Sequence, residues 1–126
     1  MATEMPLDHS FRIERHGEIA VVIPSAKVEE MHETLIEQAA RLVVQSLRED
    51  PPAGIVVDLS QVNYFGSVFV SFQLRCHALA KKSDSEIVLA GASEPARELL
   101  HLLDLETLWA LYDTRKEAVE ALSSAD

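Results

Sequence analysis

The chain has 126 residues, 48% of them hydrophobic and 25% charged, which is typical of one globular domain with a single core. Its 21 acidic residues outnumber the 11 basic ones, and the net charge of -10 disfavours nucleic acid as a partner. The one cysteine, Cys76, excludes an internal disulfide. Because no apolar run is long enough for a membrane helix or a signal peptide, we expect a cytoplasmic protein without membrane insertion.

The first predicted element is a β-hairpin. Residues 11–15 alternate between apolar and polar side chains, Gly17 interrupts the pattern, and the apolar run 19–23 ends at Pro24. Apolar residues spaced three and four apart then predict a long amphipathic helix over residues 28–48, which Pro51 and Pro52 terminate. The expected buried positions of this helix are Met31, Leu35, Ala39, Leu42, Val43 and Leu47.

The second half of the chain alternates strands with helices. The β-branched run 55–57 predicts a central strand that is buried on both faces and ends at Asp58. A helix over 67–82, a strand over 86–90 and a helix opening at Ser93 follow. A short strand over 108–112 comes next, and a capping box from Thr114 to Glu117 opens a last helix through Leu122. This order predicts an α/β fold with a mixed, largely parallel sheet of four to five strands and about four helices.

Motifs for cofactors, metals and catalysis are missing from the sequence. It contains neither of the glycine-rich patterns that hold nucleotide phosphates, and the five histidines lie too far apart for a metal site. Cys76 falls on the apolar stripe of its helix, where an inert buried thiol is favoured over a nucleophile. We therefore expect no cofactor, no metal and no enzymatic activity.

One segment stands out by its charge. Residues 59–83 contain no Asp or Glu, although the average acid content of the chain predicts roughly four there. This window is consistent with a half-buried helix or with a binding face. Ser67 lies in it at the start of a predicted helix, where two interpretations apply: a helix N-cap, or a phosphorylation site favoured by the helix dipole.

The segment from Ile55 to Ser67, read as IVVDLSQVNYFGS, resembles the signature of the STAS domain of bacterial anti-sigma factor antagonists and sulfate-type transporters. The likeness continues through the strand and turn at 86–93, the helix at 97–105 and the closing helix at 117–119. It thus covers about residues 11–122 of a single domain spanning 1–126. The resemblance implies the STAS fold, with a sheet packed against helices.

The resemblance also implies roles for individual residues. Ser67 aligns with the phosphorylated serine of the family, and Asp58 matches the acid that ends the central strand and has a structural role near the site. Gly66 replaces the usual Asp before this serine, and Asp104 stands where the family usually has Gly. Val68 and Phe69 replace a small Ser-Gly pair, which makes the loop bulkier. The implied partner-binding residues are Asn63, Tyr64, Phe65, Gly66, Ser67, Val68, Phe69 and Ser71.

Three functional hypotheses follow from the sequence. The first is a phosphoprotein of a bacterial partner-switching system that regulates transcription, in which phosphorylation of Ser67 controls binding to an anti-sigma factor or serine kinase. The second is a divergent STAS module that binds a partner constitutively, as a scaffold or beside a transporter, without kinase control. The third is a small enzyme that uses Asp58 and Ser67. A weak homodimer is compatible with each of them.

Overall fold

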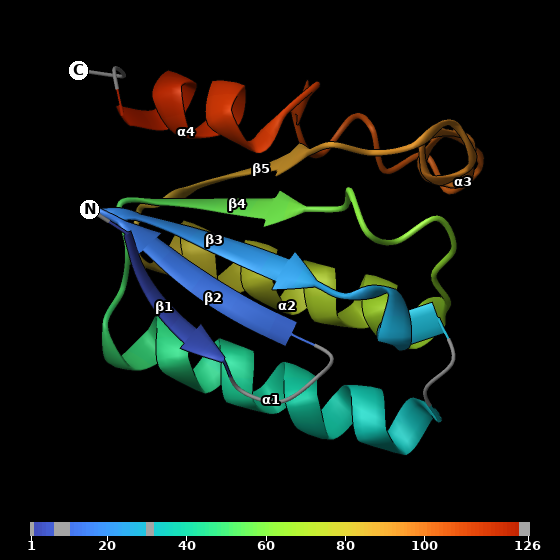
Figure 1. Cartoon of the computed structure of the whole chain (residues 1–126), viewed down its shortest axis with the longest axis horizontal. Helices are drawn as coiled ribbons and strands as arrows, with labels where there is room; N and C mark the ends of the chain where they lie inside the picture. The colour runs from blue at the N-terminus through green and yellow to red at the C-terminus, as the bar shows by residue number, and fades with distance from the viewer. Residues whose placement is uncertain (1, 7–10, 30–31, 124–126) are drawn as a thin grey trace.

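The computed structural model describes residues 2–6, 11–29 and 32–123, which form one sheet with helices on both faces (Figure 1). The sheet has six strands in the order β1-β2-β3-β4-β5-β6. Their bounds are β1 Ala2–Pro6, β2 Phe11–His16, β3 Ile19–Pro24, β4 Gly54–Asp58, β5 Glu86–Ala90 and β6 Leu111–Tyr112. Strands β1, β2 and β3 pair antiparallel, while β3 to β6 pair parallel.

The mixed, largely parallel sheet predicted from the sequence is therefore confirmed. The structure adds one strand, β1, whose short segment shows no alternation of its own and is extended because it pairs with β2. The last strand is shorter than predicted, since only Leu111 and Tyr112 pair with β5. In the β2–β3 hairpin, Gly17 has a φ of 62°, which lies in the left-handed region that favours glycine.

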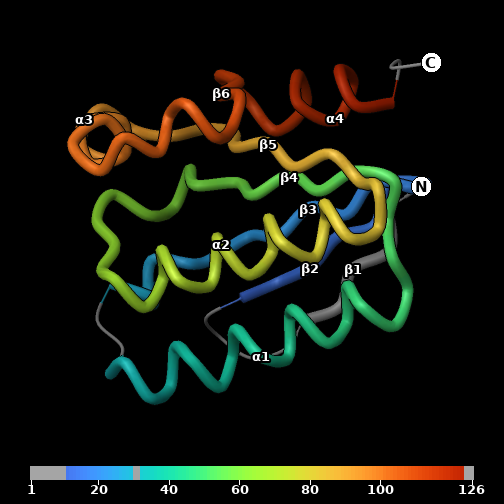
Figure 2. The backbone as a smooth tube through the Cα atoms, turned by 180° about the vertical axis from the view of Figure 1, so that it is seen from behind, coloured from blue at the N-terminus to red at the C-terminus, as the bar shows by residue number. Residues whose placement is uncertain are grey.

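Four α-helices pack against this sheet: α1 Glu33–Glu49, α2 Ser67–Lys82, α3 Glu94–Leu102 and α4 Arg115–Ser123. Figure 2 shows α1 and α2 side by side on one face. Helix α4 packs on the opposite face, and α3 lies beyond the end of β5 (Figure 1). Helix α4 begins as predicted, since the hydroxyl oxygen of Thr114 accepts the backbone N–H of Glu117 at 3.1 Å.

The first helix differs from its prediction. A 3-10 turn covers Ala26–Glu29, and α1 begins only at Glu33, where His32 caps the backbone N–H of Thr34 at 3.2 Å. Met31 lies outside the described residues. The predicted burial of Leu35 and Leu42 is wrong, because both are about half exposed. The helix instead buries Ile36, Ala39, Ala40, Val43, Val44 and Leu47, because docking against the sheet and α2 selects a neighbouring stripe of the same period.

Two hydrophobic clusters sandwich the sheet. The larger lies between the sheet and α1, α2 and α3, and the smaller lies between the sheet and α4. Strand β4 contributes Ile55 and Val57 to the first cluster and Val56 to the second, as expected of a strand buried on both faces. All four phenylalanines of the chain gather in the larger cluster, close to the start of α2.

Candidate functional site

The loop between β4 and α2 is anchored at several points, and these fix where α2 begins. The backbone N–H of Leu59 donates to the carbonyl oxygen of Ala90 at 2.8 Å, and Val62 is fully buried. Further along, the backbone N–H of Asn63 donates to the Glu29 carboxylate at 3.2 Å. The loop is thus held from below by the core and from the side by the 3-10 turn.

Ser67 is the first residue of α2, and its side chain is exposed. The N-cap position belongs to Gly66, which has no side chain to accept a hydrogen bond. The interpretation of Ser67 as the N-cap is therefore wrong, because Ser67 already lies within the first helical turn. Its hydroxyl makes no hydrogen bond with any described residue, which leaves the oxygen accessible to a modifying enzyme or a partner.

Three surface depressions meet at Ser67, which lines all of them. One of about 360 Å³ lies between α1 and α2, and one of about 190 Å³ lies between the 3-10 turn and the start of α2. The third, of about 410 Å³, lies between α2 and α3, and most of its lining residues are apolar. Ser67 thus lies on the rim that the three depressions share, and together they form a hollowed surface around the start of α2.

Acidic residues from outside the window 59–83 line the same depressions as Ser67. Glu29 and Glu33 line the smaller depression, and Glu37 lines the one between α1 and α2 together with Arg75. The window without acids in the sequence is therefore not free of acids in space. The sequence of residues 59–83 does not predict these glutamates, because they belong to a distant segment of the chain. They reach the start of α2 only because α1 packs beside α2.

The predicted partner-binding residues divide into exposed and buried groups. Tyr64 is 66% exposed, and Asn63, Gly66 and Ser71 also face solvent, whereas Val68 is half-buried. Phe65 and Phe69 are buried, at 6% and 3% exposure, with ring centroids 5.4 Å apart. These two rings belong to the core, so they support the surface from beneath instead of presenting area to a partner.

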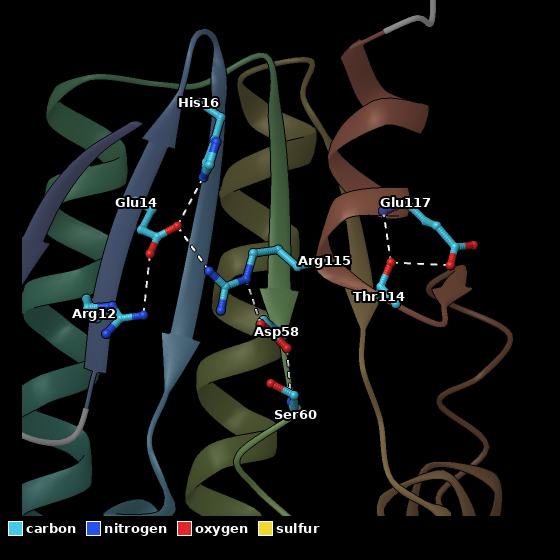
Figure 3. A network of polar contacts seen from close by, with 8 residues as sticks. All are labelled: Arg12, Glu14, His16, Asp58, Ser60, Thr114, Arg115 and Glu117. Carbon is cyan, nitrogen blue, oxygen red and sulfur yellow. Dashed lines mark hydrogen bonds and ion pairs between the residues drawn. The ribbon is translucent and has the colours of Figure 1, made fainter. Parts of the chain in front are cut away.

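The side chain of Asp58 points toward Arg115 at the start of α4 (Figure 3). Its buried carboxylate accepts a hydrogen bond from Arg115 Nε at 2.8 Å and from the backbone N–H of Ser60 at 3.0 Å. Arg115 opens α4, so this ion pair secures α4 to the end of β4 on the face opposite α2. Asp58 is thus engaged with Arg115 and Ser60, and the described residues show no hydrogen bond between Asp58 and Ser67.

Arg115 also bridges to a second carboxylate, and the result is an extended polar network (Figure 3). Its Nη1 lies 3.1 Å from Glu14, which also contacts His16 at 3.0 Å and Arg12 at 3.4 Å. Burial alone raises the pKa of Glu14. The hydrogen bond to His16 and the charges of Arg115 and Arg12 outweigh this effect and hold the pKa below its ordinary value of 4.5.

Cys76 is fully buried on α2, as expected from its place on the apolar stripe. Burial raises the pKa of its thiol to about 12, although the nearby Arg75 charge opposes the shift. Within the described ranges, no three His, Cys, Asp or Glu side chains gather where they could hold a metal ion. No helix in the same ranges has the length and apolar character needed to span a membrane.

Comparison with solved structures gives strong matches over nearly the whole chain. An anti-sigma-factor antagonist (STAS) domain protein from Planctomyces limnophilus is 26% identical, with a TM-score of 0.78 covering 91% of this chain and 99% of that one. An anti-sigma factor antagonist from Mycobacterium paratuberculosis is 27% identical, with a TM-score of 0.67 and coverage of 95% and 98%. The anti-sigma factor antagonist SpoIIAA in its unphosphorylated form shares the fold, with 14% identity, a TM-score of 0.78 and coverage of 93% and 99%.

A search of curated proteins found no match. A family model described as "Mlab, STAS domain" matches residues 25–112, well over half of the chain. The matched region includes β4, the loop before α2 and all of α2 and α3. Asp104, at the position where the resemblance implied Gly, has a φ of 58° and so lies in the left-handed region that favours glycine. Family model, fold and loop geometry agree, and the chain belongs to the STAS domain family.

Proposed function

We propose that this chain is a regulatory protein-binding module that acts as an anti-sigma factor antagonist, and that the hollowed surface around Ser67 binds its partner. The observation that supports this is the position of Ser67, which is exposed, makes no hydrogen bond with described residues, and lines three depressions. The partner is an anti-sigma factor or a serine kinase of the same bacterial cytoplasm. Asn63, Tyr64, Gly66 and Ser71 provide the exposed part of the contact.

On this proposal, phosphorylation of Ser67 acts as the switch. A phosphate adds about two negative charges at the helix start, where the unpaired backbone N–H groups of α2 favour an anion. It also adds bulk and charge to a rim shared with Glu29, Glu33 and Glu37. A partner fitted to the unmodified rim then binds less tightly, and a difference of about 1–3 kcal/mol is sufficient for regulation.

The same glutamates favour a second candidate, in which the module binds its partner constitutively. Three carboxylates beside Ser67 repel an incoming phosphate, and Gly66 offers no carboxylate of its own to a kinase. In that case the surface is a permanent docking site, and the chain acts as a scaffold or beside a transporter.

The two candidates are separated by incubation with ATP and the serine kinase of the same cell, followed by measurement of intact mass. Addition of one phosphate to the wild type, but not to Ser67→Ala, supports the switch. Ser71→Ala is the matched control, because Ser71 is exposed one turn further along α2 and lines two of the same depressions. Unchanged mass in the wild type favours constitutive binding.

Partner affinity then tests the surface itself. We expect Ser67→Asp to weaken binding by about 5- to 150-fold, and Ser67→Ala to have a much smaller effect. Equal affinity of these two variants would contradict the switch. Loss of binding in Tyr64→Ala would still support the docking surface, since Tyr64 is the most exposed aromatic side chain beside Ser67.

A further inference from the structure

Arg75 is an exposed cation on α2 that makes no hydrogen bond or ion pair with any residue in the described ranges. Each of the other arginines except Arg48 forms an ion pair with a carboxylate. Helix α2 itself supplies no such carboxylate, because residues 67–82 contain no Asp or Glu. A guanidinium without a counter-charge among the described residues is thus left on the surface of a chain whose net charge is -10.

Arg75 shares one stripe of α2 with Ser67. Ser67, Ser71 and Arg75 follow at intervals of four residues, which places them on the same side of an α-helix. All three line the depression of about 360 Å³ between α1 and α2, the two helices that lie side by side in Figure 2. Neither hydroxyl forms a hydrogen bond with a described residue, so the stripe offers two hydroxyl groups and a guanidinium to a bound group.

The opposite wall of this depression carries one carboxylate, that of Glu37 on α1. This carboxylate already has a counter-charge, because Arg41 Nη2 lies 3.0 Å from Glu37 Oε1. The other lining residues, Ala40, Val68 and Phe72, are apolar. Among the described residues, Arg75 is therefore the lining charge that lacks a counter-charge, and the depression is suited to an anionic group.

We propose that the depression between α1 and α2 receives the side chain of an Asp or Glu of the partner protein, with Arg75 as its counter-charge. This inference rests on the proposed function and names the chemistry of the partner at this point of the surface. A guanidinium can hold a carboxylate through two parallel N–H···O bonds, and the hydroxyl of Ser71, one turn away, can donate to the same group. A second copy of this chain is a poorer occupant, because two molecules of net charge -10 repel each other.

The same contact gives the proposed switch an electrostatic mechanism. Ser67 lies about two turns before Arg75 and lines the same depression. A phosphate on Ser67 would place about two negative charges there, so it would repel the carboxylate of the partner and offset the attraction of Arg75. The complex would then dissociate because like charges meet in one depression.

The test measures the affinity of the wild-type chain and its variants for the anti-sigma factor of the same cell, at about 50 mM and about 500 mM NaCl. At low salt, Arg75→Glu should weaken binding at least about tenfold and Arg75→Gln by less, because charge reversal adds repulsion to the lost attraction. High salt should reduce both effects. Arg48→Glu is the matched control and should change affinity by less than about twofold, because Arg48 is exposed on α1, has no ion pair with described residues and lines none of the three depressions.

Two further measurements identify the contact. Replacement of the contacting Asp or Glu of the anti-sigma factor by Lys, found among single Lys variants of its acidic surface residues, should restore the binding of Arg75→Glu and weaken that of the wild type. In addition, Ser67→Asp should cost several-fold less affinity in the Arg75→Gln background than in the wild type, because the charge with which it competes is already gone. Equal cost in the two backgrounds, or no Lys variant that restores binding, would overturn the proposal.

The outcomes separate this inference from the proposed function. Binding that is weakened by Ser67→Asp but is the same in Arg75→Glu and Arg48→Glu would overturn the inference and leave the proposed function standing. Weakening by Arg75→Glu with rescue by a Lys variant, but no effect of Ser67→Asp, would support the contact and contradict the switch. A dimer of the wild type that Arg75→Glu abolishes would assign the contact to a second copy and overturn the proposal, and no binding by the wild type would overturn both.

Discussion

Replacement of Arg115 should show most clearly that one face of the sheet can lose stability while the surface on the other face stays intact. Its guanidinium joins Asp58 at the end of β4 to Glu14 on β2, while its backbone begins α4. Arg115→Ala would leave the Asp58 carboxylate, only 3% exposed, with the backbone N–H of Ser60 as its remaining partner. The expected result is a large loss of stability without direct damage to the surface around Ser67, because the two sites lie on opposite faces of the sheet.

The magnitude follows from burial. Removal of one partner from a fully buried ion pair costs about 3–5 kcal/mol, because the remaining charge stays desolvated and unpaired. The Arg115 side chain is 31% exposed, so solvent weakens the pair, and we expect the lower end of that range, about 3 kcal/mol. For a chain of this length, such a loss lowers the melting temperature by about 10 °C.

Urea denaturation followed by circular dichroism measures this loss. Lys116→Ala is the matched control, because Lys116 is the next residue and is exposed, and it should change stability by less than about 0.5 kcal/mol. A double-mutant cycle with Asp58→Asn isolates the pair and should give a coupling free energy of at least about 1 kcal/mol. A loss below about 1 kcal/mol in Arg115→Ala would refute the argument that the buried pair secures α4.

Three further predictions concern the same core. The pKa of Glu14 is lowered on folding, so ionised Glu14 stabilises the folded state fully above pH 4.5, and this contribution is lost as the pH falls through the folded pKa. Glu14→Gln should therefore make the free energy of unfolding fall less steeply at acid pH. An unchanged slope would contradict this prediction. Gly91→Ala should cost at least about 2 kcal/mol in urea denaturation, because Gly91 has a φ of 69° and an added Cβ would meet Asp58 Oδ1 at 2.9 Å. Gly17 has a similar φ, but an added Cβ there would meet open space, so Gly17→Ala should lose less stability than Gly91→Ala. Equal losses in the two variants would argue against a clash at Gly91. Finally, the thiol pKa of Cys76 is about 12 against an ordinary 9.0, so the reactive thiolate is scarcer in the folded protein. Cys76 should therefore react with a disulfide reagent about a thousandfold more slowly in the native protein than in urea. Comparable rates would mean that the thiol is accessible.

The elements that could be predicted from sequence are those with strong local signals. Helix α2 has its predicted bounds, and the β2–β3 hairpin and the doubly buried β4 were recognisable from alternation, a glycine and a β-branched run. The surroundings of the candidate site are predicted less completely. The motif indicates Ser67 as a candidate, but its exposure, the burial of Phe65 and Phe69 and the position of Glu33 and Glu37 beside the same depressions depend on how α1, α2 and the loop pack together.

The sequence by itself determined the α/β order, the parallel character of the central strands, the acidic net charge and the family motif around Ser67, because each of these resides in local spacing or composition. Only the tertiary structure decided which stripe of α1 is buried, that Asp58 pairs with Arg115 on the face opposite α2, and that the Gln73 amide is buried without a hydrogen-bond partner among the described residues. These features join residues from distant segments, up to 57 positions apart for Asp58 and Arg115. Periodicity shows that a face is apolar, but contact across the fold decides what that face meets.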